Sequence, residues 1–575
     1  MKKIIKYFSL LTFGTTNAIL LTACNNQQVG FYFANFESYM SPDLLSLLGN
    51  NNTIGLNNEK IQNFNLRTFT TNEDLERNFS TNYDMGVPST YLAVKLANSG
   101  ELMVLDWKKF NLYKLDIFGN RTNEKIEKAS DALTLFTPQV RGILLAYDLS
   151  EAQEYLKQNY PQEFQLYDPE GGLLNFCVPY FLQDFCFAYK SKDGNDWDFS
   201  QDSTNNAYSW NDVKNTIVSK TKTNEINKIS SVDDSRSLYS ISKLIQNSSL
   251  NVAANINPGD AQTGLSTTLE NTISINDYEN TYLYLNQDLA RNTFYLNSDS
   301  NNVLNSFASL SGSDAIFSYN GDILFGTQGG DNFGYDASDS SAFASWIKNF
   351  FQDNNPNFFI KKADPTKDAN AVFLLLDVMV VNRKKALQNN FSNLAYSLLY
   401  KIGLEGSDLS LYTNDSKSEY ANDSIAVSDQ NDQYKYGPAL NFSYVQYTSP
   451  LTTLNAYVLN SASDVNSFDN SYTGVENTSL DSLLYGTVFD SLSLDLAGNG
   501  FFTNYYLQND LVIDASDPNS KGFLSLNQYQ SFINTLIKIY YIGNSVNANN
   551  TPRNISDLNK TNMSWAYEFA KDKNF

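Results

Sequence analysis

The N-terminal part of the chain alternates between short apolar runs and segments that carry helix-start signals. Apolar runs at 31–36, 63–69 and 83–87 predict three strands. The Ser-Pro-Asp triplet at 41–43 and the Asn-Glu-Asp triplet at 72–74 predict helix starts, because a capping side chain, an early proline and early acids all favour a helix N-terminus. The resulting βαβαβα order predicts an α/β fold with a mainly parallel sheet flanked by helices.

The segment Tyr83–Tyr91, YDMGVPSTY, is the most informative stretch of the chain. Its apolar run ends at Pro88, Ser89 can cap the backbone N–H groups that follow, and the pattern predicts a helix from Tyr91 that closes at Gly100. Open α/β sheets bind ligands at junctions of this kind, where a strand runs into a helix. We therefore expect Ser89 and Tyr91 to face a crevice rather than a core.

The N-terminus resembles an export signal. Three lysines within the first six residues precede an apolar run at 7–21, and the sequence Leu-Thr-Ala-Cys ends at Cys24. This pattern predicts a lipoprotein signal peptide over 1–23, a Cys24 that carries acyl chains such as palmitate, and a short tether over 24–30. The protein would then be anchored at the extracytoplasmic face of the cell membrane. The alternative is a transmembrane anchor, for which the run is shorter than the roughly 20 residues that cross a bilayer.

Composition narrows the possible functions. The 575 residues carry a formal net charge of −22 and a pI near 4.4, which argues against nucleic acid as a partner and favours the attraction of cations. The chain contains no histidine, so Ser-His-Asp and Cys-His catalysis are excluded. No cofactor and no metal site are predicted.

Two further cysteines, Cys177 and Cys186, lie in FCVPYFLQDFCFAY. If this segment is a hairpin, the two could form a disulfide in an extracytoplasmic compartment. The favoured interpretation is two buried free thiols. We predict a catalytic role for neither.

Several motifs occur in the order found in one protein family: FYFANFESYMSPDLL, YDMGVPSTYLAVKLANSGEL, VPYFLQDFCFAY, SWNDV, VDDSRSLYSI, DAIFSYNG and the segment 373–403. Together they cover a little over half of the chain, which thereby resembles the spermidine/putrescine-binding proteins of ABC transporters. The resemblance implies a type II periplasmic-binding-protein fold, in which two α/β lobes close over a ligand. It also implies a monomer that captures a polyamine and delivers it to permease subunits, and that is not an enzyme.

The same resemblance divides the chain into two discontinuous lobes. Lobe 1 is expected from 31–185 plus 376–445, and lobe 2 from 186–375 plus 446–575. Segments rich in Asn, Ser, Thr and Asp are expected to be polar surface insertions outside the crevice; they lie at about 247–302, 408–436 and 461–499. Residues 528–542 resemble a buried helix that ends at Gly543.

Carried over residue by residue, the family's site predicts a slot for a linear polyamine. Aromatic rings would bury the methylenes and attract the ammonium groups, and carboxylates would supply the countercharge. The expected rings are Phe36, Tyr39, Tyr91, Tyr319 and Tyr447; Ser89 would offer a hydroxyl, and Asp234, Asp377 and Glu37 would be the acids.

Two of these acids have ordinary structural alternatives. Asp234 follows Asp233 at a predicted helix start, where acids commonly serve as caps. Asp377 interrupts the apolar run 371–381, where an unpaired carboxylate is costly, and its alternative role is a salt bridge to an arginine of the lobe.

The chain also departs from the family pattern. Family members tend to have tryptophan at the positions of Phe36, Tyr319 and Leu375. The family's first-strand acid falls at Ser38, so that Glu37 would point away unless the loop is bent, and a second acid near Asp234 is replaced by Ser237. The sequence therefore leaves open a shorter diamine, another cationic metabolite, or a degenerate site.

Two other functional classes remain as alternatives. One is a surface interaction or adhesion lipoprotein on a degenerate binding-protein scaffold, consistent with the long insertions. The other is a glycoside hydrolase that uses a carboxylate pair, for which Asp233 and Asp234 are the only evident candidates; adjacent residues seldom converge on one bond.

Overall fold

The structure is a computed structural model of the chain. It describes residues 30–50, 53–116, 119, 121–192, 197–199, 208–250, 272–309, 311–327, 357–364, 367–368, 371–389, 391–408, 437–459 and 555–574. Three of the expected features lie outside these residues: the signal peptide with Cys24, the insertions at 409–436 and 461–499, and the helix at 528–542. None of the described helices is both long and apolar enough to cross a membrane.

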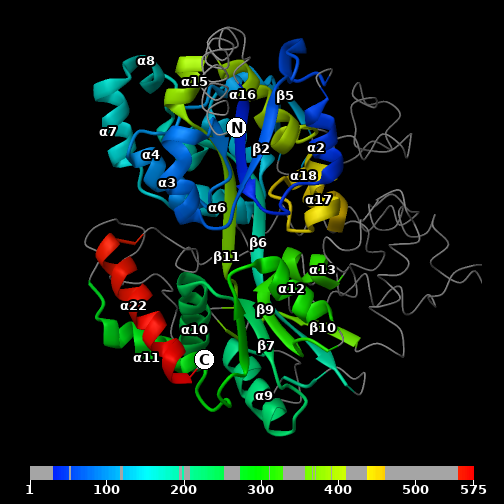
Figure 1. The fold of residues 1–575 in the computed structure, drawn as a ribbon. Helices are drawn as coiled ribbons and strands as arrows, with labels where there is room; N and C mark the ends of the chain where they lie inside the picture. The colour runs from blue at the N-terminus through cyan, green and yellow to red at the C-terminus, as the bar shows by residue number, and fades with distance from the viewer. Residues whose placement is uncertain are drawn as a thin grey trace, which may run out of the picture.

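The first lobe, the upper one in Figure 1, is built mainly from the N-terminal third of the chain, with later segments added. Its strands are β1 (Phe31–Phe36), β2 (Phe64–Phe69), β3 (Met85–Gly86), β4 (Tyr113–Leu115) and β5 (Arg121–Lys125). Its helices are α2 (Pro42–Gly49), η2 (Leu56–Asn58), α3 (Asn72–Asn82), α4 (Thr90–Asn98), η3 (Trp107–Phe110), α5 (Ala129–Ala132), η4 (Leu133–Leu135), α6 (Pro138–Leu145), α7 (Ser150–Asn159), α8 (Pro161–Phe164), η5 (Pro169–Asn175), α15 (Arg383–Asn389), α16 (Ser392–Leu399), η7 (Tyr400–Leu404), α17 (Gly437–Val445) and α18 (Thr452–Leu459).

The second lobe, the lower one in Figure 1, is built from the middle of the chain and its C-terminal helix. Its strands are β7 (Ile229–Val232), β8 (Phe294–Asn297), β9 (Ala315–Tyr319) and β10 (Asn357–Lys361). Its helices are α9 (Trp210–Lys222), α10 (Ser235–Leu250), α11 (Ile275–Leu285), α12 (Ser300–Ala308), α13 (Asn320–Thr327) and α22 (Asp557–Asn574).

Two strands connect the lobes, β6 (Cys177–Ser191) and β11 (Leu374–Val381). The strand order is β2-β1-β3-β11-β6-β9-β7-β8, with β10 also paired to β6. The first half of β6 pairs with β11 in lobe 1, and its second half pairs with β9 and β10 in lobe 2. Within each lobe the neighbouring βαβ strands are parallel, as in the β1–β2 and β7–β8 pairs. The predicted two-lobe, type II α/β fold is confirmed.

Local predictions near the N-terminus agree closely with the structure. The three expected strands correspond to β1, β2 and β3, and the Ser41 hydroxyl accepts a hydrogen bond from the Asp43 N–H at 3.2 Å at the start of α2. After α4 the chain turns at Gly100, whose φ of 77° lies in the left-handed region that glycine adopts without strain.

Two predictions about later segments need correction. The segment 247–302 is not simply a polar insertion, because its described part from residue 272 contains α11 and β8, and β8 pairs in parallel with β7. α11 buries Tyr278 and Tyr282. These two core residues were overlooked in the sequence because the segment is rich in Asn and Thr. The boundary at residue 446 also differs, since α18 lies with lobe 1: Leu451 bridges to Phe136 just before that helix begins.

The cysteine segment is one continuous strand rather than a hairpin. Cys177 and Cys186 lie at opposite ends of β6, and both are buried free thiols. Burial raises the pKa of both thiols. The preferred interpretation from the sequence therefore agrees with the structure.

The C-terminal helix α22 packs against α10 and α11 of lobe 2 and reaches toward lobe 1 (Figure 1). Its buried face includes Ala566 and Tyr567, and the Tyr567 ring lies 5.2 Å from the ring of Tyr282 on α11. At its N-terminal end, Lys560 forms an ion pair of 3.7 Å with Glu76 on α3. Thus α22 contacts both lobes.

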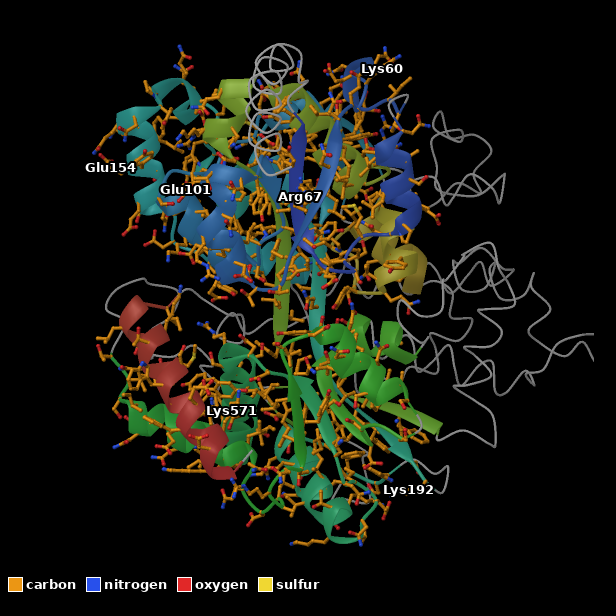
Figure 2. The ribbon with its side chains drawn as sticks, in the orientation of Figure 1. Lys60, Arg67, Glu101, Glu154, Lys192 and Lys571 are labelled. Carbon is orange, nitrogen blue, oxygen red and sulfur yellow. The ribbon has the colours of Figure 1, made fainter. Side chains whose placement is uncertain are left out.

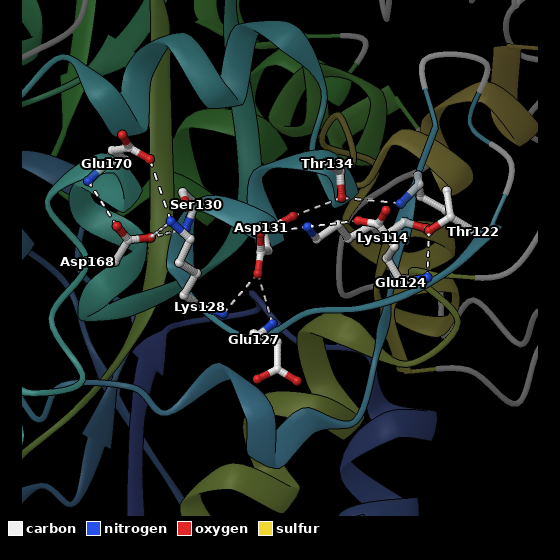
Figure 3. A network of polar contacts seen from close by, with 11 residues as sticks. Lys114, Thr122, Glu124, Glu127, Lys128, Ser130, Asp131, Thr134, Asp168 and Glu170 are labelled. Atoms are coloured by element: carbon white, nitrogen blue, oxygen red, sulfur yellow. Dashed lines mark hydrogen bonds and ion pairs between the residues drawn. The ribbon is translucent and has the colours of Figure 1, made fainter.

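A network of charged and polar side chains connects β4, β5, α5 and η5 within lobe 1 (Figure 3). Lys114 contacts Glu124 at 3.2 Å and Asp131 at 2.9 Å, and Asp168 accepts a hydrogen bond from the Ser130 N–H at 2.8 Å. The Lys114–Asp131 contact joins β4 to α5, and the Ser130–Asp168 hydrogen bond joins α5 to the start of η5. Lys114 and Lys128 are thus paired with acids of the same lobe.

Candidate functional site

A cleft of about 280 Å³ lies between the lobes, beside the strands that connect them. Lobe 1 contributes the ends of β1 and β3 and the starts of α3 and α4, and lobe 2 contributes the ends of β7 and β9 and the start of α10. All nine side chains predicted from the sequence line this cleft: Phe36, Glu37, Tyr39, Ser89, Tyr91, Asp234, Tyr319, Asp377 and Tyr447. The structure brings them together from positions far apart in the chain, and ligand contact by each remains a prediction.

Asp377 is the central acid of the cleft. It lies on β11 beside a bulge, and its side chain is 0 % exposed. Its carboxylate accepts hydrogen bonds from the Ser89 hydroxyl at 2.7 Å, from the Tyr39 hydroxyl at 2.8 Å and from the Gln183 amide. Among the described residues no lysine or arginine forms an ion pair with Asp377, so the alternative role in a salt bridge is not supported.

The environment of Asp377 disfavours its charge. Burial raises the pKa of Asp377 from 3.8 to about 6, and the three hydrogen bonds from Ser89, Tyr39 and Gln183 offset only part of that effect. A buried carboxylate with neutral donors and no cation is costly unless a positive group reaches it. A cationic group that reached Asp377 would therefore stabilise its charged carboxylate.

A second acid, Asp322, lies on the lobe 2 side of the cleft in the first turn of α13. It accepts hydrogen bonds from the Ser318 hydroxyl at 2.7 Å and from the Tyr447 hydroxyl. Burial raises the pKa of Asp322, although these two hydrogen bonds oppose the shift. Asp322 and Asp377 thus place one carboxylate from each lobe near the connecting strands.

Aromatic rings stand beside these acids. The Tyr39 ring packs edge-on against the Tyr447 ring, with centroids 5.2 Å apart, and Phe36 packs edge-on against Tyr39 at 5.8 Å. Tyr39 and Tyr447 are each only 6 % exposed, and burial raises the pKa of both phenols. The two phenol hydroxyls are therefore neutral hydrogen-bond donors, and their packed rings form part of the cleft wall.

A different group of charges surrounds Tyr91 on α4. The guanidinium of Arg236, from the start of α10 in lobe 2, lies over the Tyr91 ring with its Cζ 5.7 Å from the centroid. Glu73 on α3 and Asp234 before α10 also line this part of the cleft. Desolvation raises the pKa of Glu73, and the nearby Asp234 charge adds to the increase.

Negative charge dominates the cleft. Among the residues that the structure describes, its lining contains one basic side chain, Arg236, and six acidic side chains: Glu37, Glu73, Asp233, Asp234, Asp322 and Asp377. Such a cleft attracts cations and repels anions.

The expected role of Ser89 as a side-chain cap is wrong. Ser89 occupies the N-cap position of α4, but its side chain makes no cap hydrogen bond. Its hydroxyl instead donates to Asp377 and accepts from the Asn72 amide at 3.0 Å, while its N–H donates to the Asn72 side-chain oxygen at 3.0 Å. The buried carboxylate competes successfully for the hydroxyl because a bond to a charged group is the stronger one.

The condition that the sequence set for Glu37 is met, and one prediction about position changed. The loop after β1 is bent, with Ser38 at a φ of 53°, and Glu37 lines the cleft with an exposed side chain. Ser298, Ser300 and Asn301, which we expected outside the crevice, line it as well, and the Asn301 amide donates to the Ser38 hydroxyl at 3.4 Å across the lobes.

Aromatic rings line the cleft even though smaller residues stand at the positions where the resembled family tends to have tryptophan. Leu375 lines it beside three phenylalanines that the sequence reasoning missed: Phe185, Phe317 and Phe373. Phe185 and Phe373 pack edge-on, with their centroids 5.8 Å apart.

Asp233 and Asp234 do not form an acid pair. Both oxygens of Asp233 lie 3.1 Å from the Lys571 amine of α22, and the Tyr567 hydroxyl also donates to Asp233. Asp234 instead caps α10 by accepting from the Ser237 N–H at 2.6 Å. The arrangement gives no support to carboxylate-pair hydrolysis, and in the described part of the chain no cluster of acids and cysteines is arranged to hold a metal ion.

The polar cleft residues that were missed from the sequence include Glu73, Gln183, Arg236 and Asp322. Glu73 was interpreted only as a helix-start acid. Gln183 interrupts the apolar run of β6, a signal comparable to that of Asp377 on β11. Asp322 lies three positions after the expected aromatic residue Tyr319, in the first turn of a helix that was not predicted from the sequence.

Comparison with known proteins places the chain in a family. Residues 1–573 match the family model described as "Hypothetical lipoprotein (MG045 family)". The chain belongs to this family. No curated protein matches this MG045-family lipoprotein.

Solved structures similar to this MG045-family lipoprotein include three bacterial proteins. A putative spermidine/putrescine ABC transporter protein from Listeria monocytogenes is 13% identical, with a TM-score of 0.38 and coverage of 81% of this chain and 98% of the other. The spermidine/putrescine substrate-binding protein PotD from Streptococcus pneumoniae is 13% identical, with a TM-score of 0.37 and the same coverage. The Tp0655 (TpPotD) lipoprotein of Treponema pallidum is 13% identical, with a TM-score of 0.36, and covers 65% of this chain and 82% of the other. Similarity at this level carries no information about the ligand.

Proposed function

We propose that the protein is a lipid-anchored solute-binding protein that captures a small cationic amine, such as a polyamine, between its lobes and delivers it to the permease of an ABC transporter. The observation that carries this proposal is the buried Asp377 carboxylate, which lies in an acidic, ring-lined cleft and has no cationic partner among the described residues.

An alkyl ammonium fits the chemistry of this cleft. Asp377 and Asp322 offer a carboxylate from each lobe, and the rings of Tyr39, Tyr447 and Tyr319 offer apolar surface for methylenes. A ligand that contacts both lobes favours the arrangement in which they are close together, so binding and lobe closure are coupled. The mechanism is capture by a hinge, without chemistry on the ligand.

The first test is a thermal-unfolding screen of the full-length chain, purified in detergent, against putrescine, spermidine, spermine, thiamine and basic amino acids. A ligand at a concentration of about 100 Kd stabilises the folded state by about 2.7 kcal/mol. We expect a concentration-dependent rise in Tm with one amine, and we expect Asp377→Asn to make this rise much smaller at the same amine concentration.

Asp184→Asn is the matched control. Asp184 is also a buried acid on a connecting strand, but it forms an ion pair with Lys362 and does not line the cleft. This variant should keep the ligand-dependent rise, whatever its own Tm. The absence of any shift with every compound would instead favour a surface interaction protein on a degenerate scaffold.

A further inference from the structure

Arg236 is the one feature of the cleft that the proposed capture of a cation does not explain. It lies in the first turn of α10 and is the only basic side chain among the described residues that line the cleft. Its guanidinium crosses from lobe 2 to the Tyr91 ring of lobe 1, with Cζ 5.7 Å from the ring centroid. A cation at this distance from a ring face is attracted by the ring's quadrupole.

The surroundings of Arg236 are those that a ligand ammonium would require. The Glu73 and Asp234 carboxylates line the same part of the cleft. Burial raises the pKa of the Tyr91 and Tyr319 phenols; the charge of Asp234 adds to this increase, and the charge of Arg236 opposes it. Ring faces and carboxylates together make a cation site. In this part of the cleft that site already holds a positive group.

A second group of acids in the cleft differs. Asp377 and Asp322 lie beside the connecting strands, and their hydrogen-bond partners are neutral hydroxyl and amide groups: Tyr39, Ser89, Gln183, Ser318 and Tyr447. The cleft therefore has one group of acids with a built-in cation beside it and a second group whose carboxylates lack one among the described residues.

We propose that Arg236 acts as an internal cation that fills the part of the cleft around Tyr91 and so restricts the ligand to a short amine with one or two ammonium groups. This inference rests on the proposed function. A longer polyamine would have to place a further ammonium next to the guanidinium, where the repulsion of like charges opposes it. Arg236 is thus a residue that sets specificity for ligand length.

The test compares putrescine, spermidine and spermine by isothermal titration calorimetry on the full-length chain in detergent. Arg236→Gln removes the charge and keeps much of the side-chain length, and Arg236→Lys keeps the charge. We expect the wild-type chain to prefer putrescine, and Arg236→Gln to shift the ratio of the spermidine and putrescine affinities toward spermidine by about tenfold. Arg236→Lys should retain the wild-type ratio.

Arg67→Gln is the matched control. Arg67 also stands over a tyrosine ring, with its Cζ 5.2 Å from the centroid of Tyr32, but it is exposed on β2 and does not line the cleft (Figure 2). This variant should leave all three affinities unchanged. Melting curves verify that each variant is folded.

The outcomes separate the two proposals. An unchanged affinity ratio in folded Arg236→Gln, while the wild-type chain binds amines, overturns the role of Arg236 and leaves the proposed function intact. Loss of all amine binding in folded Arg236→Gln also overturns it, because Arg236 would then be required for binding rather than exclude a further ammonium group. A wild-type chain that binds none of the three amines overturns the proposed function, and the inference with it.

Discussion

Protonation of Asp377 should make amine binding depend on pH between 5 and 7. The pKa of this buried acid is about 6 in the ligand-free protein, against an ordinary value of 3.8. A bound ammonium stabilises the charged carboxylate and lowers that pKa. Binding therefore releases a proton whenever Asp377 is protonated beforehand.

The size of the effect follows from the fraction of ionised Asp377. With a pKa of about 6, roughly nine-tenths of the ligand-free molecules carry the charged carboxylate at pH 7, and roughly one-tenth do so at pH 5. If only the ionised form binds, Kd weakens about tenfold from pH 7 to pH 5. The chain contains no histidine, so no imidazole titrates in this range.

The stability of the ligand-free protein should change in the opposite direction. A carboxyl group whose folded pKa is raised contributes stability that is fully present below its unfolded pKa and is lost as the pH rises through its folded pKa. For Asp377 the loss amounts to about 3 kcal/mol between roughly pH 4 and pH 7. The difference in unfolding free energy between the wild-type chain and Asp377→Asn isolates this contribution from that of other acids.

The assay is calorimetric titration of the best amine at pH 5, 6 and 7 and constant ionic strength, in buffers of different ionisation enthalpy. Asp322 and Glu73, whose pKa values are also raised, contribute to the change of affinity with pH in the wild-type chain and in Asp377→Asn. Asp377→Asn should lose the part of this pH dependence and of the proton release that belongs to Asp377. Asp184→Asn should keep both. Equal pH dependence in the wild-type chain and Asp377→Asn would refute the reasoning.

Two further predictions concern the lobe 2 side of the cleft. Asp322→Asn removes the carboxylate that this lobe contributes next to the connecting strands, and we expect it to weaken amine binding about tenfold or more in calorimetry. Because the charge of Asp322 also raises the pKa of Asp377, this substitution should shift the pH dependence due to Asp377 to lower pH. Lys560→Ala removes the 3.7 Å ion pair of α22 with Glu76 across the lobes and should weaken binding about two- to fivefold at low salt, an effect that high salt should abolish. Lys573→Ala, which removes an ion pair within lobe 2, should have no effect on affinity, and an equal effect of both substitutions would exclude a role of the inter-lobe pair.

The sequence predicted the parts of the structure that depend on local patterns. The βαβ order of lobe 1 and the helix starts at Ser41 and Asn72 follow from periodicity and from caps, signals that depend on neighbouring residues. The nine candidate cleft residues came instead from the resemblance to a known family, and the structure places all nine in the lining of the cleft.

The errors arose where tertiary contacts outweighed a local preference. The Ser89 hydroxyl bonds to a carboxylate 288 positions away rather than to its own helix. The segment with α11 and β8 looked polar because its buried tyrosines are few, and Arg236 looked like an ordinary residue of a helix start. Only the packing of the two lobes shows that Arg236 lies over Tyr91.

The continuity of β6 has a consequence for how the molecule is made. Both lobes complete their sheets on this one strand, and β11, which carries Asp377, joins it only after nearly two hundred further residues have been synthesised. Until β11 arrives, β3 and the first half of β6 present unpaired edges, which are prone to pair with other chains. A nascent chain that ends before residue 374 therefore has neither a finished first lobe nor the central acid, and folding is expected to be late and dominated by long-range contacts.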